Sequence, residues 1–161
     1  MITYAMEKQS FCMQPALRLH RLSFLLEKAA DQALQQKLDL TFSQCMILHS
    51  LRNNPDCSQQ SIAKCRDLTQ AAVSRQVEML RGKGLINRTE NPANRREHVL
   101  KLTAKGTKQL EKGMDIIIEK FESVFTVLTK AEMQVLQGST EKLLESMYKG
   151  MGGDKCCPEV E

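Results

Sequence analysis

The fold is decided by residues 69–103, which read TQAAVSRQVEMLRGKGLINRTENPANRREHVLKLT. Thr69 is a residue type that caps helices, and Val73, Val77 and Leu80 follow it at spacings that place them on one helical face. The glycines of the GKG triplet favour the end of that helix. The first half of the stretch therefore predicts an amphipathic helix with one buried face.

The second half of the stretch predicts a β-hairpin. Residues 85–90 and 98–102 predict two short strands, and the turn-forming residue types over 91–96 predict a loop too long for a tight turn. Arg95 and Arg96 would stand at the tip of this hairpin, where they support no core and have only one adjacent acid. We expect these two arginines to serve a partner outside the fold.

Two more helices precede this stretch. Ser58 can cap a short helix over residues 58–65, and the turn RDL separates it from the helix described above. Further upstream, the tetrapeptide TFSQ is a capping box that opens another helix, with Cys45, Leu48 and Leu51 on one side. Two short helices joined by a turn are a helix-turn-helix pattern, and a hairpin directly after them predicts a winged helix.

Long apolar stripes flank this central part. The first lies between Pro15, placed near a helix start, and Leu38. The second begins after Thr103, and a capping box, TKAE, then opens a last helix. Such stripes need partners, and a dimerisation region is favoured over a bundle within one chain. The stripe residues are Leu22, Leu25, Leu26, Ala29 and Ala33, then Leu110, Met114, Ile117, Phe121, Val124 and Leu128, and finally Met133, Leu136, Thr140, Leu143 and Met147.

The composition agrees with a mainly α fold. The chain has 161 residues, of which 42% are hydrophobic and 4% aromatic, so it can form a core and favours helix over sheet. We expect a first dimerisation helix over residues 1–40, a winged helix-turn-helix domain over 41–103, the last dimerisation helices over 104–149 and a flexible tail over 150–161. No apolar run could span a membrane and no secretory signal is visible, so a cytoplasmic location without membrane contact is expected.

Positive charge is concentrated in the middle of the chain. The net charge is +4, and residues 58–105 contain ten Lys or Arg against four Asp or Glu. This distribution is typical of a polyanion-binding module on a neutral scaffold, and an uneven solvated surface is the alternative that charge alone leaves open.

The helix after Thr69 carries side chains that can read DNA. With its valines turned inward, Gln70, Ser74, Arg75 and Glu78 turn outward. Gln and Arg make paired hydrogen bonds to adenine and guanine edges in the major groove, which predicts a recognition helix. The hairpin would be the wing, with its arginines at the minor groove or its phosphates. The candidate DNA-binding residues are Ser58, Ser61, Lys64, Thr69, Gln70, Ser74, Arg75, Gln76, Arg88, Asn94, Arg95 and Arg96.

Together these pieces resemble the MarR family of transcriptional regulators. The resemblance runs from about Leu17 to Tyr148 and depends mainly on SIAKCRDLTQAAVSRQVEMLRGKGLINR and NRREHVLKLTAKG, with LTFSQCMILHSL and LTKAE in support. It implies a homodimer that binds a double-stranded DNA operator, as a repressor or an activator. It also implies that Arg96 enters the minor groove. The family usually has an aspartate two residues before this arginine, where this chain has Asn94.

The resemblance also implies control by a signal, either a small phenolic or lipophilic effector or the oxidation of a cysteine. His20 is a candidate for lining an effector pocket, with a surface position as the alternative. Cys12, expected before the first helix, and Cys57 and Cys65, around the short helix, are candidate redox residues, with inert small side chains as the alternative. Cys45 is expected in the core. No cofactor is expected, and no zinc-site spacing is present.

One other function class stays open from the sequence. A winged-helix module that binds proteins would carry its charge incidentally, and its binding to random DNA would lack a steep salt dependence. An enzyme is not expected, because the sequence has no nucleophile elbow and no phosphate-binding loop.

Overall fold

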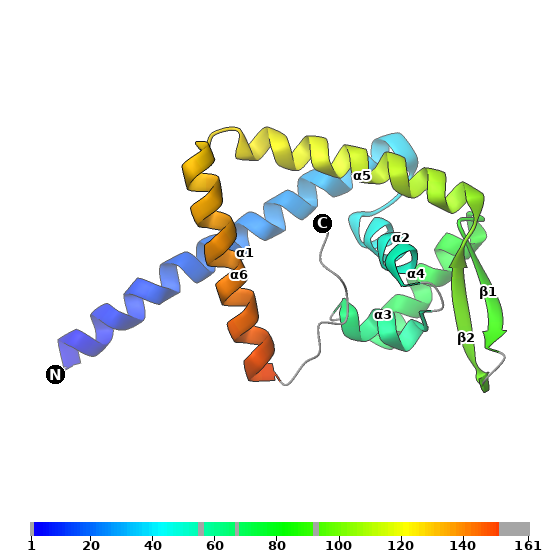
Figure 1. Cartoon of the computed structure of the whole chain (residues 1–161), viewed down its shortest axis with the longest axis horizontal. Helices are drawn as coiled ribbons and strands as arrows, with labels where there is room; N and C mark the ends of the chain where they lie inside the picture. Colours follow the sequence, from blue (N-terminus) through cyan, green and yellow to red (C-terminus); the bar gives the residue numbers. More distant parts are fainter. Residues whose placement is uncertain (1, 55–56, 67, 92–93, 152–161) are drawn as a thin grey trace.

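The computed structural model describes residues 2–54, 57–66, 68–91 and 94–151, with the side chains of residues 2–12, 90–98 and 151 excepted. Its elements are α1 (Ile2–Leu38), α2 (Phe42–Asn53), α3 (Gln59–Cys65), α4 (Gln70–Gly82), β1 (Ile86–Asn91), β2 (Asn94–Leu102), α5 (Ala104–Phe125) and α6 (Lys130–Met151). Helices α2, α3 and α4 gather beside the hairpin, and α1, α5 and α6 extend away from them (Figure 1). The predicted winged helix-turn-helix fold, mainly α, is confirmed.

Side-chain caps begin the helices where the sequence places them. The Gln44 backbone N–H donates to the Thr41 hydroxyl and the Thr41 N–H donates to the Gln44 side chain, each at 3.1 Å, which completes the predicted capping box. Hydroxyl caps also begin α3, α4 and α5, at Ser58, Thr69 and Thr103. Each cap satisfies an N–H group that the first turn of a helix leaves without an intrahelical acceptor.

Helix α2 is the centre of the core. It is buried from Gln44 to Leu51, which is more than the side with Cys45, Leu48 and Leu51 that the sequence indicated. Helices α1 and α5 and strand β2 all pack against α2, and a helix enclosed by several neighbours keeps no solvated face. Ile47 and Leu48 of α2 are fully buried, as are Leu34, Ile62, Leu80 and Leu110 of other helices.

Strand β2 is longer than predicted, and β1 has the predicted length but begins one residue later. Strands β1 and β2 pair antiparallel from Ile86 opposite Leu102 to Asn91 opposite Asn94, with an irregularity in register after Glu90. The predicted loop over 91–96 is therefore wrong in extent, because Asn94 and the two arginines after it already belong to β2. Backbone pairing requires no apolar side chain, so polar residue types that predict a loop can still extend a ladder.

Helix α1 also differs from the expectation. Pro15 lies inside the helix, which begins at Ile2, so the predicted start near Pro15 is wrong. The same holds for Cys12, for which the sequence predicts a place before the helix and which lies within it. A proline removes one backbone donor and crowds the carbonyl four residues earlier, and helical hydrogen bonds can resume on both sides of that defect.

Helices α5 and α6 leave much of their apolar surface uncovered in one chain. The stripe on α5 is buried at Leu110 and Ile117 but exposed at Val124. Leu128, predicted to continue this stripe, lies beyond the end of α5, in the turn before the Thr129 cap of α6. In Figure 1, α6 leaves the end of α5 steeply and does not run alongside it. None of the helices in the described residues is long and apolar enough to cross a membrane.

Candidate nucleic-acid interface

Helix α4 presents one polar face to solvent. Val73, Val77 and Leu80 are fully buried, as predicted. The Thr69 hydroxyl accepts a hydrogen bond from the Ala72 N–H at 3.2 Å and so begins the helix. The exposed side chains on the opposite face are Gln70, Ser74, Arg75 and Glu78, which are the residues predicted from the sequence to point outward. This face therefore offers both amide and guanidinium groups to a partner.

Gln76 lies at the border of that face. It comes three residues after Val73 and four before Leu80, so the helical repeat places it beside the buried side. Its side chain is half-buried, and its Oε1 is buried with no hydrogen-bond partner among the described residues. Base reading by Gln76 stays a prediction, and it would require this oxygen to turn outward.

Helix α3 adds hydroxyl groups and a lysine beside the start of α4. The Ser58 hydroxyl caps α3 by accepting from the Ser61 N–H at 3.1 Å, and the two hydroxyl oxygens are 3.0 Å apart. Lys64 is exposed. A depression of about 420 Å³ lies between α3 and the start of α4, lined by Gln60, Ala63, Lys64, Leu68, Thr69 and Gln70. Three predicted DNA-binding residues, Lys64, Thr69 and Gln70, are thus brought together.

Glu78 connects the polar face of α4 to the wing. Its carboxylate lies 3.0 Å from Arg81 on the same helix and 3.6 Å from Arg88 on β1. Arg88 is exposed, so this ion pair is solvated and orients the guanidinium more than it stabilises the fold. The link between Glu78 and Arg88 has no signal in the sequence, where only the Glu78–Arg81 spacing along one helix is visible.

For the two wing arginines, only the position of the backbone is described. Arg95 and Arg96, with Asn94, belong to β2 and not to a loop as predicted. Their side chains lie outside the described residues, so the contacts predicted for them stay predictions.

Gly84, with φ of +70°, follows α4 and lets the chain reverse into β1.

The candidate signal residues lie in different environments. Cys45 is in the core as expected, and burial raises the pKa of its thiol to about 11, so it has almost no reactive thiolate near neutrality. Cys57 and Cys65 are both half-buried; Cys57 precedes the Ser58 cap of α3, and Cys65 is the last residue of α3. His20 is exposed on α1. Burial, then the charges of nearby arginines, lowers the pKa of His49, which favours its neutral form inside α2.

An apolar groove lies where α1 passes the corner between α5 and α6. It has a volume of about 680 Å³, and its lining includes Leu22, Val124, Leu128, Val135 and Leu136. His20 is not among its lining residues, so the predicted pocket role of His20 receives no support from this groove.

Comparisons with known proteins agree with this geometry. The sequence model of the MarR family matches residues 40–98, which include α2, α3, α4 and most of the hairpin. The putative transcriptional regulatory protein for the hcr operon of Thauera aromatica is 29% identical over 103 residues, covering 64% of this chain and 60% of that protein.

Solved structures match over most of the chain. The structure of S. aureus MepR with DNA is 27% identical, with a TM-score of 0.72, and the match covers 81% of this chain and 96% of that one. A mutant of E. coli MarR complexed with operator DNA is 22% identical, with a TM-score of 0.74, covering 84% of this chain and 97% of that one. At the latter identity the likeness concerns the fold alone.

Proposed function

We propose that the chain is a transcriptional regulator of the MarR family, whose sequence model matches residues 40–98, and that it binds a pseudo-palindromic DNA operator as a homodimer and represses transcription until a signal releases it. The observation that carries this proposal is the exposed face of α4, where Gln70, Ser74 and Arg75 stand on a helix whose other face is buried. A helix held in this way can enter the major groove as a rigid body.

Base reading would come from α4. The Arg75 guanidinium suits the O6 and N7 acceptors of guanine, and the Gln70 amide suits the N6 and N7 edge of adenine. Ser74, on the same exposed face, can donate to or accept from either type of base. Gln76 is a fourth reader if its side chain rotates outward.

Phosphate contacts would set the register. Ser58, Ser61 and Thr69 lie at the first turns of α3 and α4, where backbone N–H groups and the helix dipole favour anions. Lys64 adds an exposed positive charge beside them. On the other side, Arg88 and the wing residues Asn94, Arg95 and Arg96 would contact the neighbouring minor groove or its backbone.

Homodimer formation would cover the apolar surface that one chain leaves open. On α1, Met13, Leu17 and Phe24 are exposed, and on α6 the exposed apolar side chains are Val135, Leu143, Leu144 and Met147. Large apolar patches on folded chains mark interaction surfaces, and a second copy would place two α4 helices for two half-sites. The partner of these helices is therefore proposed to be the same protein.

Leu143→Glu is expected to weaken this dimer by at least roughly hundredfold, because both copies would bury a carboxylate in an apolar contact. Leu143 is 55% exposed in the single chain, so the substitution should leave the chain folded. Sedimentation equilibrium over micromolar concentrations measures the effect. Lys142→Glu is the control, because it introduces a carboxylate at the adjacent position, which is already charged and exposed. It should change the dissociation constant of the dimer little. A wild-type chain that is monomeric throughout would contradict the dimer.

Release by a signal has two candidate routes. The groove between α1, α5 and α6 could hold a lipophilic effector next to the proposed dimer contacts, since its lining is almost entirely apolar. Oxidation of Cys57 or Cys65 would disturb α3, and with it the phosphate contacts. Both routes belong to this proposal.

Selection of bound duplexes from a random pool tests the function, with parallel arms in reductant and in oxidant. We expect enriched duplexes with two inverted half-sites in reductant. Loss of enrichment in oxidant favours the thiol route, and unchanged enrichment favours an effector. A chain that enriches no sequence in any arm overturns DNA recognition and leaves a protein-interaction module as the function.

A further inference from the structure

The corner between α1 and α2 contains an aspartate in a backbone conformation that usually selects glycine. Asp39 has φ of +53°, in the left-handed region, directly after the last residue of α1. Glycine is the common residue at this position after a helix, and aspartate is among the few others that tolerate it. Aspartate at this position adds a carboxylate to the turn, which glycine would not supply.

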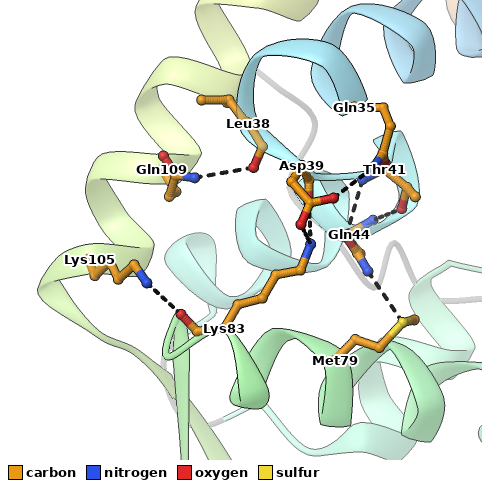
Figure 2. A network of polar contacts seen from close by, with 9 residues as sticks. All are labelled: Gln35, Leu38, Asp39, Thr41, Gln44, Met79, Lys83, Lys105 and Gln109. Carbon is orange, nitrogen blue, oxygen red and sulfur yellow. Dashed lines mark hydrogen bonds and ion pairs between the residues drawn. The ribbon is translucent and has the colours of Figure 1, made fainter.

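That carboxylate faces Lys83, the C-cap residue of α4 (Figure 2). The Lys83 ammonium lies 3.0 Å from Asp39 Oδ2 and also donates to the Asp39 backbone carbonyl. The Gln35 amide donates to Asp39 Oδ1 at 2.7 Å and holds the carboxylate from the α1 side. These hydrogen bonds, from Lys83 first and then Gln35, followed by the charge of Lys83, lower the pKa of the Asp39 carboxyl.

The end of α4 is held from α5 as well. The Lys105 ammonium donates to the Lys83 carbonyl at 2.7 Å. Nearby, the Gln44 amide of α2 lies 3.9 Å from the Met79 sulfur of α4. Figure 2 shows these groups converging on the last turn of α4 from α1, α2 and α5. The helix proposed to read DNA is thus fastened at its far end to helices that extend into the proposed dimer region.

An exposed ion pair of this kind contributes little to stability. The side chains of Lys83 and Asp39 are 32% and 74% exposed, and solvated pairs are weak because water screens them. Their position matters more than their strength, since the pair lies between α1 and α4 and would occur once in each copy of a dimer. A small change in the angle of α4 would occur in both copies, so the relative position of the two α4 helices would change by twice that amount.

We infer that Asp39 and Lys83 are positioning residues: their contact fixes the end of α4 against α1 and so sets the spacing between half-sites that the dimer accepts. This inference rests on the proposed function, because a spacing preference requires a DNA-binding dimer. It deepens that function by assigning the choice of operator spacing to a contact that touches no base and no phosphate.

The test uses Asp39→Gly and Lys83→Gln in the full-length chain. Asp39→Gly removes the carboxylate while relieving the backbone conformation, so a loss of folding is not expected. Dissociation constants are measured for duplexes whose two half-sites are separated by the optimal spacer or by one base pair more or less. Both variants should lose roughly three- to tenfold of the wild-type discrimination between spacers.

Two further variants separate positioning from charge. Lys83→Arg keeps a positive donor toward Asp39 and should restore most of the preference. Lys108→Gln removes the same charge from an exposed position on α5 and should lower affinity for all spacers alike, without altering their ranking. Hydrogen exchange of residues 79–85, measured without DNA, should be faster in Asp39→Gly than in wild type.

The outcomes distinguish this inference from the function on which it rests. A wild-type chain that selects no duplex overturns the proposed function, and with it the role of Asp39 and Lys83 in setting the spacing between half-sites. If the wild type prefers one spacer and both Asp39→Gly and Lys83→Gln keep that preference within twofold, the inference alone is overturned. Unchanged hydrogen exchange at the end of α4 would overturn it in the same way.

Discussion

Arg75→Ala is expected to remove most of the sequence preference of DNA binding while leaving the fold intact. Arg75 is exposed on α4, whose buried side chains are Val73, Val77 and Leu80. A paired contact from arginine to guanine contributes about 1–3 kcal/mol of discrimination, and a dimer makes it twice, so specific affinity should fall at least roughly thirtyfold. Fluorescence anisotropy with a selected duplex and a scrambled duplex measures both affinities.

Lys64→Ala is the matched control for Arg75→Ala. Lys64 is exposed beside the start of α4 and is assigned to phosphate, so its loss should weaken selected and scrambled duplexes alike. The salt dependence of binding should also become shallower, by about one counterion for each lost contact. Equal binding by both variants and the wild type at moderate salt would refute the assignment of α4 as the reading helix.

Gly106→Ala is expected to destabilise the chain by about 3 kcal/mol or more. A Cβ added at Gly106 would lie 1.9 Å from the Leu85 carbonyl oxygen and 2.9 Å from its carbon, both in the backbone. That same carbonyl accepts the Thr103 N–H at 3.0 Å, so moving it would also disturb the cap of α5. Thermal unfolding should show a midpoint lower by about 10 °C.

Gly138→Ala provides the comparison for Gly106→Ala. Gly138 is inside α6, and a Cβ there would meet no atom within 4 Å. Alanine is the better helix former, so this variant should be as stable as the wild type or more stable by up to about 1 kcal/mol. If the two alanine variants unfolded at the same temperature, the close approach of α5 to the base of the wing would be wrong.

The sequence predicted those features that depend on neighbours along the chain. Caps at Thr41, Ser58, Thr69 and Thr103 could be recognised because a hydroxyl side chain bonds an N–H only three residues away. The buried face of α4 followed from the helical repeat alone. The exposed residues on the opposite face of α4 could be predicted from the same repeat.

Features that depend on distant contacts were missed or misplaced. The pairing of Asn91 with Asn94 is decided by the backbone ladder, and residue types at the tip gave no sign of it. Lys83 meets Asp39 across 44 positions of sequence, and Arg88 meets Glu78 across a turn between a helix and a strand. Neither pair has a short-range pattern that a single sequence could reveal.

In the proposed complex, two copies of α4 enter successive major grooves while the wings contact the flanking minor grooves. A hydroxyl-radical footprint of the wild-type chain on a duplex selected from a random pool tests it most directly. We expect two protected stretches related by inversion, with centres about 10 base pairs, or a multiple of this, apart. A single protected stretch at every protein concentration, or no protection on any selected duplex, would contradict it.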